Sequence, residues 1–273
     1  MNLRGVFDHE YPVIGMVHLP PLPGAPGYDG PRRRIHDCAI ADARTLKAGG
    51  VDAILVENFG DAPFHPTEVP PHVVAEMTAL TGTVAECADV PVGVNVLRND
   101  AVAAISVAAA AGAAFVRVNV HVGTAATDQG ILEGRAHETL RLRERIDASV
   151  AILADVYVKH ATPLDDASVA ERARETVERG MADGLIVSGS GTGEGTDPTD
   201  VERVAAATAH LERDVPVFVG SGVQPGTVRN HFEAGADGLI VGTALKRDGV
   251  TTNPVSLDAV RAVVEARDAC VDG

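Results

Sequence analysis

The chain has 273 residues, a formal net charge of −15 and a sequence pI of about 5.0. So acidic a chain is not expected to bind a nucleic-acid polymer, because such binding requires a basic surface. No apolar run approaches the ~20 residues of a transmembrane helix, and the N-terminal segment lacks the apolar core of a secretory signal, so we expect a cytoplasmic protein without integral membrane association.

Strand-like apolar runs alternate with Ala-rich amphipathic segments along the chain. We predict strands over 13–19, 51–58, 90–97, 114–122, 150–158, 183–189, 215–222 and 237–245, and helices near 33–49, 67–87, 100–112, 135–146, 165–180, 198–212, 224–234 and 255–270. This alternation is typical of parallel strands joined by crossover helices. Eight such units predict an α/β fold, a single (β/α)₈ TIM barrel domain over residues 1–273, with an open doubly wound sheet as the alternative.

The segment "FVRVNVHVG" (115–123) shows which side of a strand faces the barrel interior. Its valines alternate with Arg117, Asn119 and His121, and a period of two is typical of a strand. In a barrel, one face of each strand packs against helices and the other points inward. We therefore predict that the valines face the helices and that the three polar residues face the barrel axis.

The same alternation places polar residues near the carboxyl ends of the other early strands, where barrel enzymes carry their active sites. Burying polar groups without partners is costly, so a cluster of them indicates a ligand site. The predicted catalytic residues are Glu57, Asn119, Asp155 and Lys159, and the predicted substrate-binding residues are His18, Asn95, Arg117, His121 and Tyr157.

Several roles stay open for these residues at this level. Arg117 either contacts substrate or forms a structural ion pair with Glu57 or Asp155. Lys159 is one of only three lysines, and a desolvated lysine can lose its proton and act as a base or nucleophile. Glu57 and Asp155 are candidate general bases or Mg²⁺ ligands, although no spacing in the sequence demands a metal or another cofactor.

Glycine-rich turns follow the last predicted strands. In "FVGSGV" and "IVGTAL" the backbone N–H groups of such turns can hold a phosphate, as in many barrels. A third such segment, "SGSGTGEGTD" (188–197), lies next to them in the predicted strand order. The predicted phosphate-binding residues are Ser188, Gly189, Gly220, Ser221, Gly222, Gly242 and Thr243, and the predicted ligand is a small phosphorylated molecule.

Two long loops, 20–34 and 123–138, are candidate lids over this site, since long loops in compact domains are often functional. Arg32, Arg33 and Arg34 form a basic run that either begins the first helix or meets an anionic ligand or partner. The scarcity of lysine and aromatic residues, with surplus carboxylates, is typical of a halophilic protein. Three scattered cysteines predict reduced thiols, and a homo-oligomer is the default expectation.

Long motifs in the chain resemble the BtpA family. They include "GMVHLPPLPGAPGYDG", "VRVNVHVGTAATDQGILEGRAHETLRLR" and "DGLIVSGSGTGEGTD", and the resemblance extends from about residue 11 to about residue 248. It implies a TIM barrel of the ribulose-phosphate-binding type. The family's cyanobacterial namesake is linked to photosystem I, whereas the SgcQ-type members belong to sugar-utilisation operons.

Two functions are therefore expected. The first is an enzyme, a lyase, isomerase, hydrolase or transferase, that acts on a sugar phosphate or a nucleotide-derived compound at the mouth of the barrel. The second is a non-enzymatic assembly factor, as in photosystem I biogenesis. The inward polar residues favour the enzyme, because an assembly factor would not need them.

Overall fold

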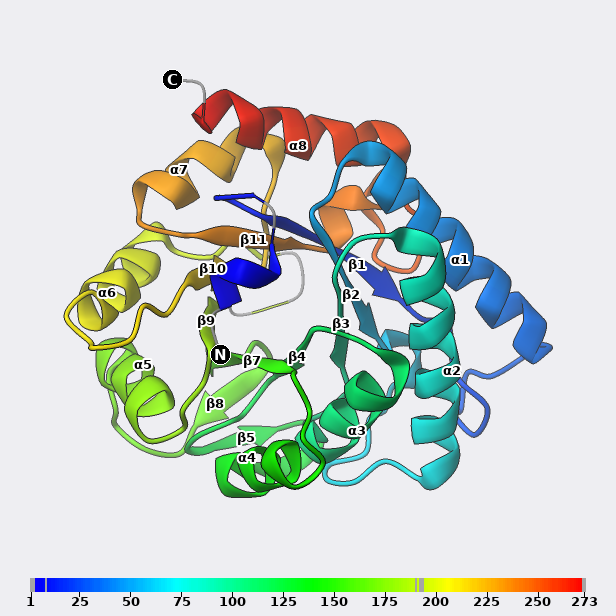
Figure 1. Cartoon of the computed structure of the whole chain (residues 1–273), viewed down its shortest axis with the longest axis horizontal. Helices are drawn as coiled ribbons and strands as arrows, with labels where there is room; N and C mark the ends of the chain where they lie inside the picture. The colour runs from blue at the N-terminus through cyan, green and yellow to red at the C-terminus, as the bar shows by residue number, and fades with distance from the viewer. Residues whose placement is uncertain (1–2, 8, 190, 192–193, 272–273) are drawn as a thin grey trace.

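Eight parallel strands close into a barrel (Figure 1). The computed structural model describes residues 3–7, 9–189, 191 and 194–271. Each strand pairs in parallel with its two neighbours, and the order around the ring is β1–β2–β3–β4–β7–β9–β10–β11. The strands are β1 (Val13–His18), β2 (Ala53–Glu57), β3 (Val92–Asn95), β4 (Phe115–Val118), β7 (Ala151–Tyr157), β9 (Gly184–Val187), β10 (Val217–Val219) and β11 (Gly238–Val241). The predicted (β/α)₈ barrel is confirmed, and the open sheet is excluded.

Helices surround the barrel, and each follows a strand as predicted (Figure 1). They are α1 (Arg32–Gly49), α2 (Pro71–Ala88), α3 (Ala101–Ala111), α4 (Ala136–Arg145), α5 (Val169–Glu178), α6 (Pro198–Thr208), α7 (Val228–Glu233) and α8 (Leu257–Val271). Asp100 caps α3 by accepting a hydrogen bond from the N–H of Ala103, as its position before an Ala-rich run indicates. None of these helices, within the described residues, has the length and hydropathy that a membrane span requires.

The barrel strands separate two apolar clusters. Valines such as Val116 and Val118 pack outward against the helices. The opposite face of the strands fills the interior with Met16, Leu55, Phe115 and Leu153, among others. A Cβ on residue 93 would lie 2.1 Å from the Phe115 ring, so the glycine there leaves room for this large side chain. The alternation in the sequence therefore predicted correctly which face of each strand points into the barrel interior.

The amino-terminal segment closes the bottom of the barrel, which the sequence did not predict. The 3₁₀ helix η1 (Leu3–Val6) places Leu3 in the interior cluster, and Phe7 follows it. The Phe7 ring lies 5.8 Å from the rings of both Phe115 and Phe218, measured between centroids. Leu3 and Phe7 thus fill the barrel interior from its amino-terminal end.

A second, antiparallel sheet lies beside the barrel where the sequence predicts the loop 123–138. The strands β5 (Thr124–Thr127) and β6 (Gly130–Glu133) form a hairpin, and β8 (Ala161–Pro163) pairs with β5. Short 3₁₀ turns complete the connections: η2 (Phe59–Asp61), η3 (Pro225–Thr227), η4 (Thr243–Leu245) and η5 (Arg247–Gly249). The hairpin gives this candidate lid a defined backbone.

Candidate functional site

A cavity of about 460 Å³ lies at the carboxyl ends of the barrel strands. It brings together residues that lie far apart in the sequence. Of the residues predicted as catalytic or substrate-binding, those that line it are His18, Glu57, Arg117, Asn119 and Lys159. Of the residues predicted to bind phosphate, those that line it are Gly220, Ser221, Gly222, Gly242 and Thr243.

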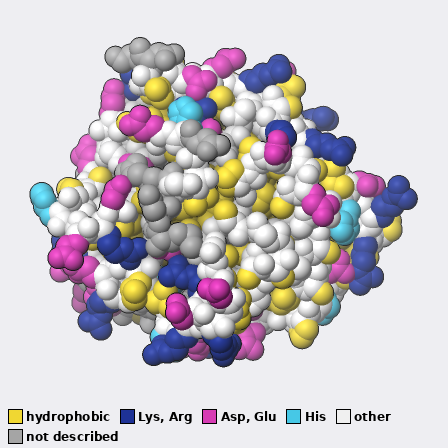
Figure 2. All heavy atoms as spheres, viewed as in Figure 1, with side chains coloured by type: hydrophobic (Ala, Val, Ile, Leu, Met, Phe, Trp, Pro, Cys, Tyr) yellow, Lys and Arg dark blue, Asp and Glu magenta, His cyan; other side chains and the backbone are white. Residues whose placement is uncertain are grey.

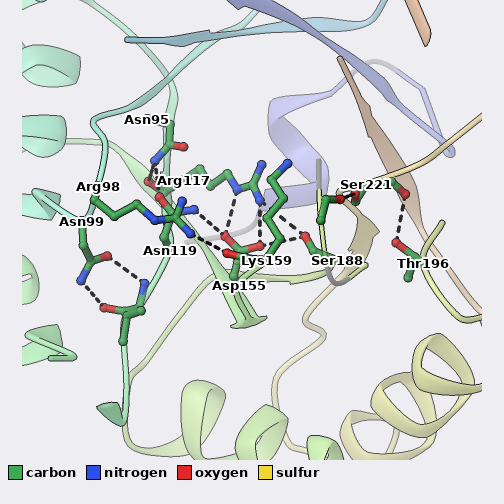
Figure 3. A network of polar contacts seen from close by, with 12 residues as sticks. Asn95, Arg98, Asn99, Arg117, Asn119, Asp155, Lys159, Ser188, Thr196 and Ser221 are labelled. Carbon is green, nitrogen blue, oxygen red and sulfur yellow. Dashed lines mark hydrogen bonds and ion pairs between the residues drawn. The ribbon is translucent and has the colours of Figure 1, made fainter. Parts of the chain in front are cut away.

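The floor of the cavity is a buried ion-pair network centred on Asp155 (Figure 3). The guanidinium of Arg117 donates to both carboxylate oxygens of Asp155, at 2.9 and 2.8 Å. Asn119 and Ser188 each donate a further hydrogen bond to the same carboxylate, both at 3.1 Å. Each carboxylate oxygen of Asp155 thus accepts two hydrogen bonds, and Asp155 does not line the cavity. Its position is that of a group that orients Arg117 and Asn119.

Glu57 and Lys159 are the less constrained ionisable groups in the cavity. Burial raises the pKa of the Glu57 carboxyl, against the opposing effect of Arg117 and Lys159. Burial likewise lowers the pKa of Lys159 to about 8, with Arg117 acting in the same direction. Such opposite shifts are typical of groups that exchange protons near neutral pH.

His18 lies against Glu57 at the end of β1. Its Nε2 is 3.8 Å from Oε1 of Glu57, and its ring stacks at a tilt on Phe59 with 4.9 Å between centroids. Burial lowers the pKa of His18 to about 3, with Lys246 and Lys159 as further causes. The imidazole is therefore neutral at ordinary pH, so it can take part in hydrogen bonding but adds no positive charge.

The glycine turns after β10 and β11 form one wall of the cavity. A Cβ on Gly220 would lie 2.5 Å from Ile186 and 2.9 Å from the Ser188 hydroxyl, and a Cβ on Gly242 would lie 2.9 Å from the His18 ring. Glycine is needed at both positions because the inward side chains approach the backbone so closely. Thr243 and Ala244 open the turn η4, so their N–H groups have no intrahelical acceptor.

The described residues of the loop after β9 support this wall and are not among the residues that line the cavity. The Ser221 hydroxyl lies 3.0 Å from the carbonyl oxygen of Gly191 and 2.9 Å from that of Glu194, and it donates to this loop. Gly189 packs against the same loop, since a Cβ there would lie 2.6 Å from the Glu194 carbonyl oxygen. Of the predicted segment 188–197, residues 190, 192 and 193 lie outside the described residues.

Two predicted substrate-binding residues point away from the cavity. His121 is buried, and its Nε2 lies 2.8 Å from the carbonyl oxygen of Gly180 beside α5. The strand β4 ends at Val118, so the alternation no longer sets the direction of residue 121. Tyr157 follows a break in the register of β7 after Asp155, and its hydroxyl donates to the carbonyl of Ala167.

Asn95 has the predicted inward direction but lies below the cavity. Its side-chain amide donates to the carbonyl oxygen of Arg117 at 3.0 Å and to Oδ1 of Asn119 at 3.1 Å (Figure 3). Like Ser188, it is in contact with the residues of the floor. Asn95 therefore holds the Asn119 side chain in position through this hydrogen bond.

The structure adds cavity residues that the sequence analysis did not select. Arg98 follows β3, Asp128 lies at the tip of the β5–β6 hairpin, and Phe59 and Phe64 follow β2. His160 lies beside Lys159 on the same wall. Each lies beyond a strand end, where alternation gives no direction. For Arg98 and Phe59 the one available signal was position, since they follow Asn95 on β3 and Glu57 on β2.

The donors for a metal ion are sparse. Within the described residues, no group of three or more His, Cys, Asp or Glu side chains is placed to hold a metal ion. Of the two candidate Mg²⁺ ligands, Asp155 is engaged by Arg117, Asn119 and Ser188.

A model of the BtpA family matches residues 9–269 of this chain. Photosystem I biogenesis protein BtpA of Synechocystis is 44% identical over 266 residues, which cover 97% of this chain and 91% of that protein. An uncharacterised protein of Thermococcus kodakarensis is 46% identical, covering 93% and 94%. The putative sgc region protein SgcQ of Escherichia coli is 34% identical, covering 96% of each chain.

Solved structures with the same fold include enzymes of low sequence identity. A thiamine phosphate pyrophosphorylase of Pyrococcus furiosus superposes with a TM-score of 0.58 at 16% identity, covering 96% of this chain and 97% of that one. Phosphoribosyl anthranilate isomerase of Thermus thermophilus gives 0.56 at 12% identity, covering 94% and 98%. At such identities the likeness shows the TIM-barrel fold alone.

Proposed function

This chain belongs to the BtpA family, and we propose that it is an enzyme acting on a small phosphorylated metabolite at the mouth of its barrel. One observation carries the proposal: the glycine turns after β10 and β11 share a single cavity with Glu57 and Lys159. A phosphate group and a reacting group can therefore be held at the same time. The names of structural neighbours, which include a pyrophosphorylase and an isomerase, support this by analogy of fold.

In this proposal the phosphate lies on Gly220–Gly222 and on Gly242–Thr243. The N–H groups that open η4 are free of intrahelical acceptors, and the two glycines allow an anion to approach the backbone. The Ser221 hydroxyl is directed at the neighbouring loop, so its main-chain N–H is the more suitable donor. This pattern of backbone donors requires no basic side chain at the phosphate.

At the reacting end we favour proton transfer next to a carbonyl group, as in isomerisation or aldol cleavage. In isomerisation the Glu57 carboxylate accepts the proton as the C–H bond breaks, and in aldol cleavage it accepts the proton of the β-hydroxyl group as the C–C bond breaks. In both reactions the electron pair of the broken bond moves onto the carbonyl oxygen. The ammonium of Lys159 stabilises the charge on that oxygen. Glycoside hydrolysis or phosphoribosyl transfer would use two carboxylates, and they are less favoured because Asp155 is already fully hydrogen-bonded.

The proposal predicts selective binding of phosphorylated compounds. We expect phosphosugars and nucleotides to raise the melting temperature, and the corresponding unphosphorylated sugars and nucleosides to leave it unchanged, because the glycine turns bind the phosphate. The measurement is a thermal-shift screen in high salt, with and without Mg²⁺. For any compound that binds, Gly242→Val should abolish the shift, because the added side chain fills the phosphate wall.

A screen in which no phosphorylated compound stabilises the protein would contradict the enzyme proposal. It would favour the second function, a non-enzymatic assembly role. That role rests on the name of the Synechocystis relative, which is a photosystem I biogenesis protein.

We also propose that the protein works in the cytoplasm. Cys38, Cys87 and Cys270 are all free thiols in the structure, which supports a reducing compartment. Assembly into a homo-oligomer remains a prediction.

A further inference from the structure

We propose that the substrate carries a second anionic group, a carboxylate or a second phosphate, and that Arg98 binds it on the wall opposite the glycine turns. This inference rests on the proposed phosphate site and narrows its substrate class to compounds with an anionic group at each end. Nothing in the alternation of the strands selects Arg98, and its role follows from its surroundings in the fold.

Arg98 is a buried cation without a carboxylate partner. Its side chain lines the cavity, and the residue is only 5% exposed. Its Nη2 donates to the main-chain oxygen of Lys159, and within the described residues no carboxylate lies within ion-pair distance of it. A guanidinium has five N–H donors in a planar fork that matches a carboxylate or phosphate. Burying such a charge unpaired is costly, which is why an anion from outside the chain is expected here.

The backbone around Arg98 is fixed before any ligand binds. The N–H of Leu97 donates to Oδ1 of Asn58 at 2.7 Å, and the N–H of Arg98 itself donates to the carbonyl of His65 at 3.2 Å. On the other side, the Asn99 side chain forms hydrogen bonds with both the N–H and the carbonyl of Val120, at 2.8 and 2.9 Å. On this fixed backbone the Arg98 side chain, which is itself hydrogen-bonded to the Lys159 main-chain oxygen, loses less entropy when it binds a ligand.

The strand order places Arg98 across the barrel from the phosphate wall. Arg98 follows β3, and in the closed ring β3 is four places from β10, whose turn carries Gly220–Gly222. A ligand that spans the cavity from the glycine turns therefore reaches Arg98. Glu57 is the last residue of β2 and Lys159 follows β7, so the two lie on either side of this line.

The other charges in the cavity leave Arg98 available. Arg117 is neutralised by Asp155, and Asp155 has no lone pair left for Arg98. Asp128 lies on the exposed tip of the hairpin, where water screens it. Glu57 forms no ion pair with Arg98 within the described residues, and its charge acts on Arg98 only from a greater distance. Burial lowers the pKa of Arg98, against the opposing effect of the Asp155 and Glu57 charges, so the guanidinium is desolvated more than these carboxylates compensate.

The test compares ligands that differ only in the second anion. Phosphoglycerate carries a phosphate and a carboxylate, glycerol phosphate lacks the carboxylate, and glycerate lacks the phosphate; a pentulose bisphosphate and its monophosphate form a second pair. By calorimetry, we expect the doubly anionic member of at least one pair to bind about tenfold more tightly than the singly phosphorylated member. Arg98→Gln should abolish this difference and leave the affinity for the monophosphate within about twofold.

Two further variants separate a binding role from a structural one. Arg98→Lys keeps the positive charge and should restore part of the difference, and Arg141→Gln, which removes an exposed arginine from α4, should leave it unchanged. If doubly and singly anionic ligands bind equally well, or if the difference survives Arg98→Gln, the second anion site is wrong while the phosphate site stands. If no phosphorylated ligand binds at all, the proposed function fails first.

Discussion

Arg117 shows how one residue organises the candidate site. It is only 1% exposed, and its Nε and Nη2 both donate to Asp155. Of the two roles considered from the sequence, the ion pair with Asp155 is present, and substrate contact stays a prediction because Arg117 also lines the cavity. A buried pair of this kind adds little net stability, but removing either partner leaves an uncompensated charge. Arg117 and Asp155 therefore hold Asn119 and the cavity floor in place.

The environment of Lys159 differs from that of an ordinary surface lysine. No hydrogen bond or ion pair to its ammonium is found within the described residues, and burial lowers its pKa to about 8. The charge of Glu57 raises the pKa of Lys159 and partly offsets this effect. The two groups are therefore coupled, and a change in one should be measurable at the other.

We predict that the amine of Lys159 becomes reactive toward acylation with a midpoint near its pKa of about 8. In Glu57→Gln the midpoint should move to lower pH, because the loss of the negative charge favours the neutral amine. Competitive labelling followed by peptide mass spectrometry measures this for each lysine separately. The exposed Lys47 is the internal reference. A midpoint near ~10.4, the ordinary value for lysine, would contradict the assignment.

At the scale of elements, η1 and Phe7 act as a plug for the barrel. Phe7 is 7% exposed and contacts two aromatic rings that belong to β4 and β10. These strands lie on different sides of the ring, so the plug links them through the interior. The amino-terminal segment thus contributes to the core although it belongs to no β/α unit.

Phe7→Ala should lower the free energy of unfolding by about 3 kcal/mol, because it removes a buried ring and leaves a cavity. Urea denaturation, with the midpoint and slope fitted separately, measures the loss. Val102→Ala on the exposed face of α3 is the control and should change stability by less than about 0.5 kcal/mol. Equal effects of the two substitutions would mean that the plug does not support the barrel.

The boundaries of the strands explain which site residues could be predicted from the sequence. His18, Glu57, Asn95, Arg117 and Asp155 lie within strands, where the period of two sets their direction correctly. His121 lies beyond the end of β4, and Tyr157 follows a register shift in β7, so their directions differ from the pattern. Alternation therefore predicts a side-chain direction only as far as the ladder of regular hydrogen bonds extends.

For the molecule as a whole, surplus negative charge is the dominant electrostatic feature. The formal net charge is −15. On the face in Figure 2, acidic and basic side chains are interspersed around the periphery, and the centre carries few charges. The run Arg32–Arg34 is paired with Glu76, Asp37 and Asp29, so it forms no separate basic patch. Self-repulsion of the acidic surface should oppose the compact state at low salt.

We predict that the melting temperature at about pH 7.5 rises as KCl increases from about 0.1 to about 2 M, since salt screens this repulsion. Scanning calorimetry measures the effect. At the sequence pI of about 5.0 the net charge is near zero, and the same increase in salt should have a smaller effect. A melting temperature that does not respond to KCl at neutral pH would argue against adaptation to salt.

The sequence by itself determined the eight β/α units, their order and the inward faces of the strands. Each of these follows from local periodicity, because a strand repeats every two residues and a helix every 3.6 residues. It also placed the glycine turns of 220–222 and 242–243 at the carboxyl ends of the last strands. These features can be predicted from short stretches of sequence, because they depend only on residues that are close together along the chain.

Only the tertiary structure decided which groups face each other across the cavity. In the folded chain Asp155 pairs with Arg117, and the side chains of His121 and Tyr157 point away from the cavity. Arg98 lies across the cavity from the glycine turns. It also inserted Phe7 into the barrel and folded 124–133 into a hairpin. The physical reason is that these contacts join residues far apart in sequence, and closure of the ring, rather than any local repeat, sets the distances between them.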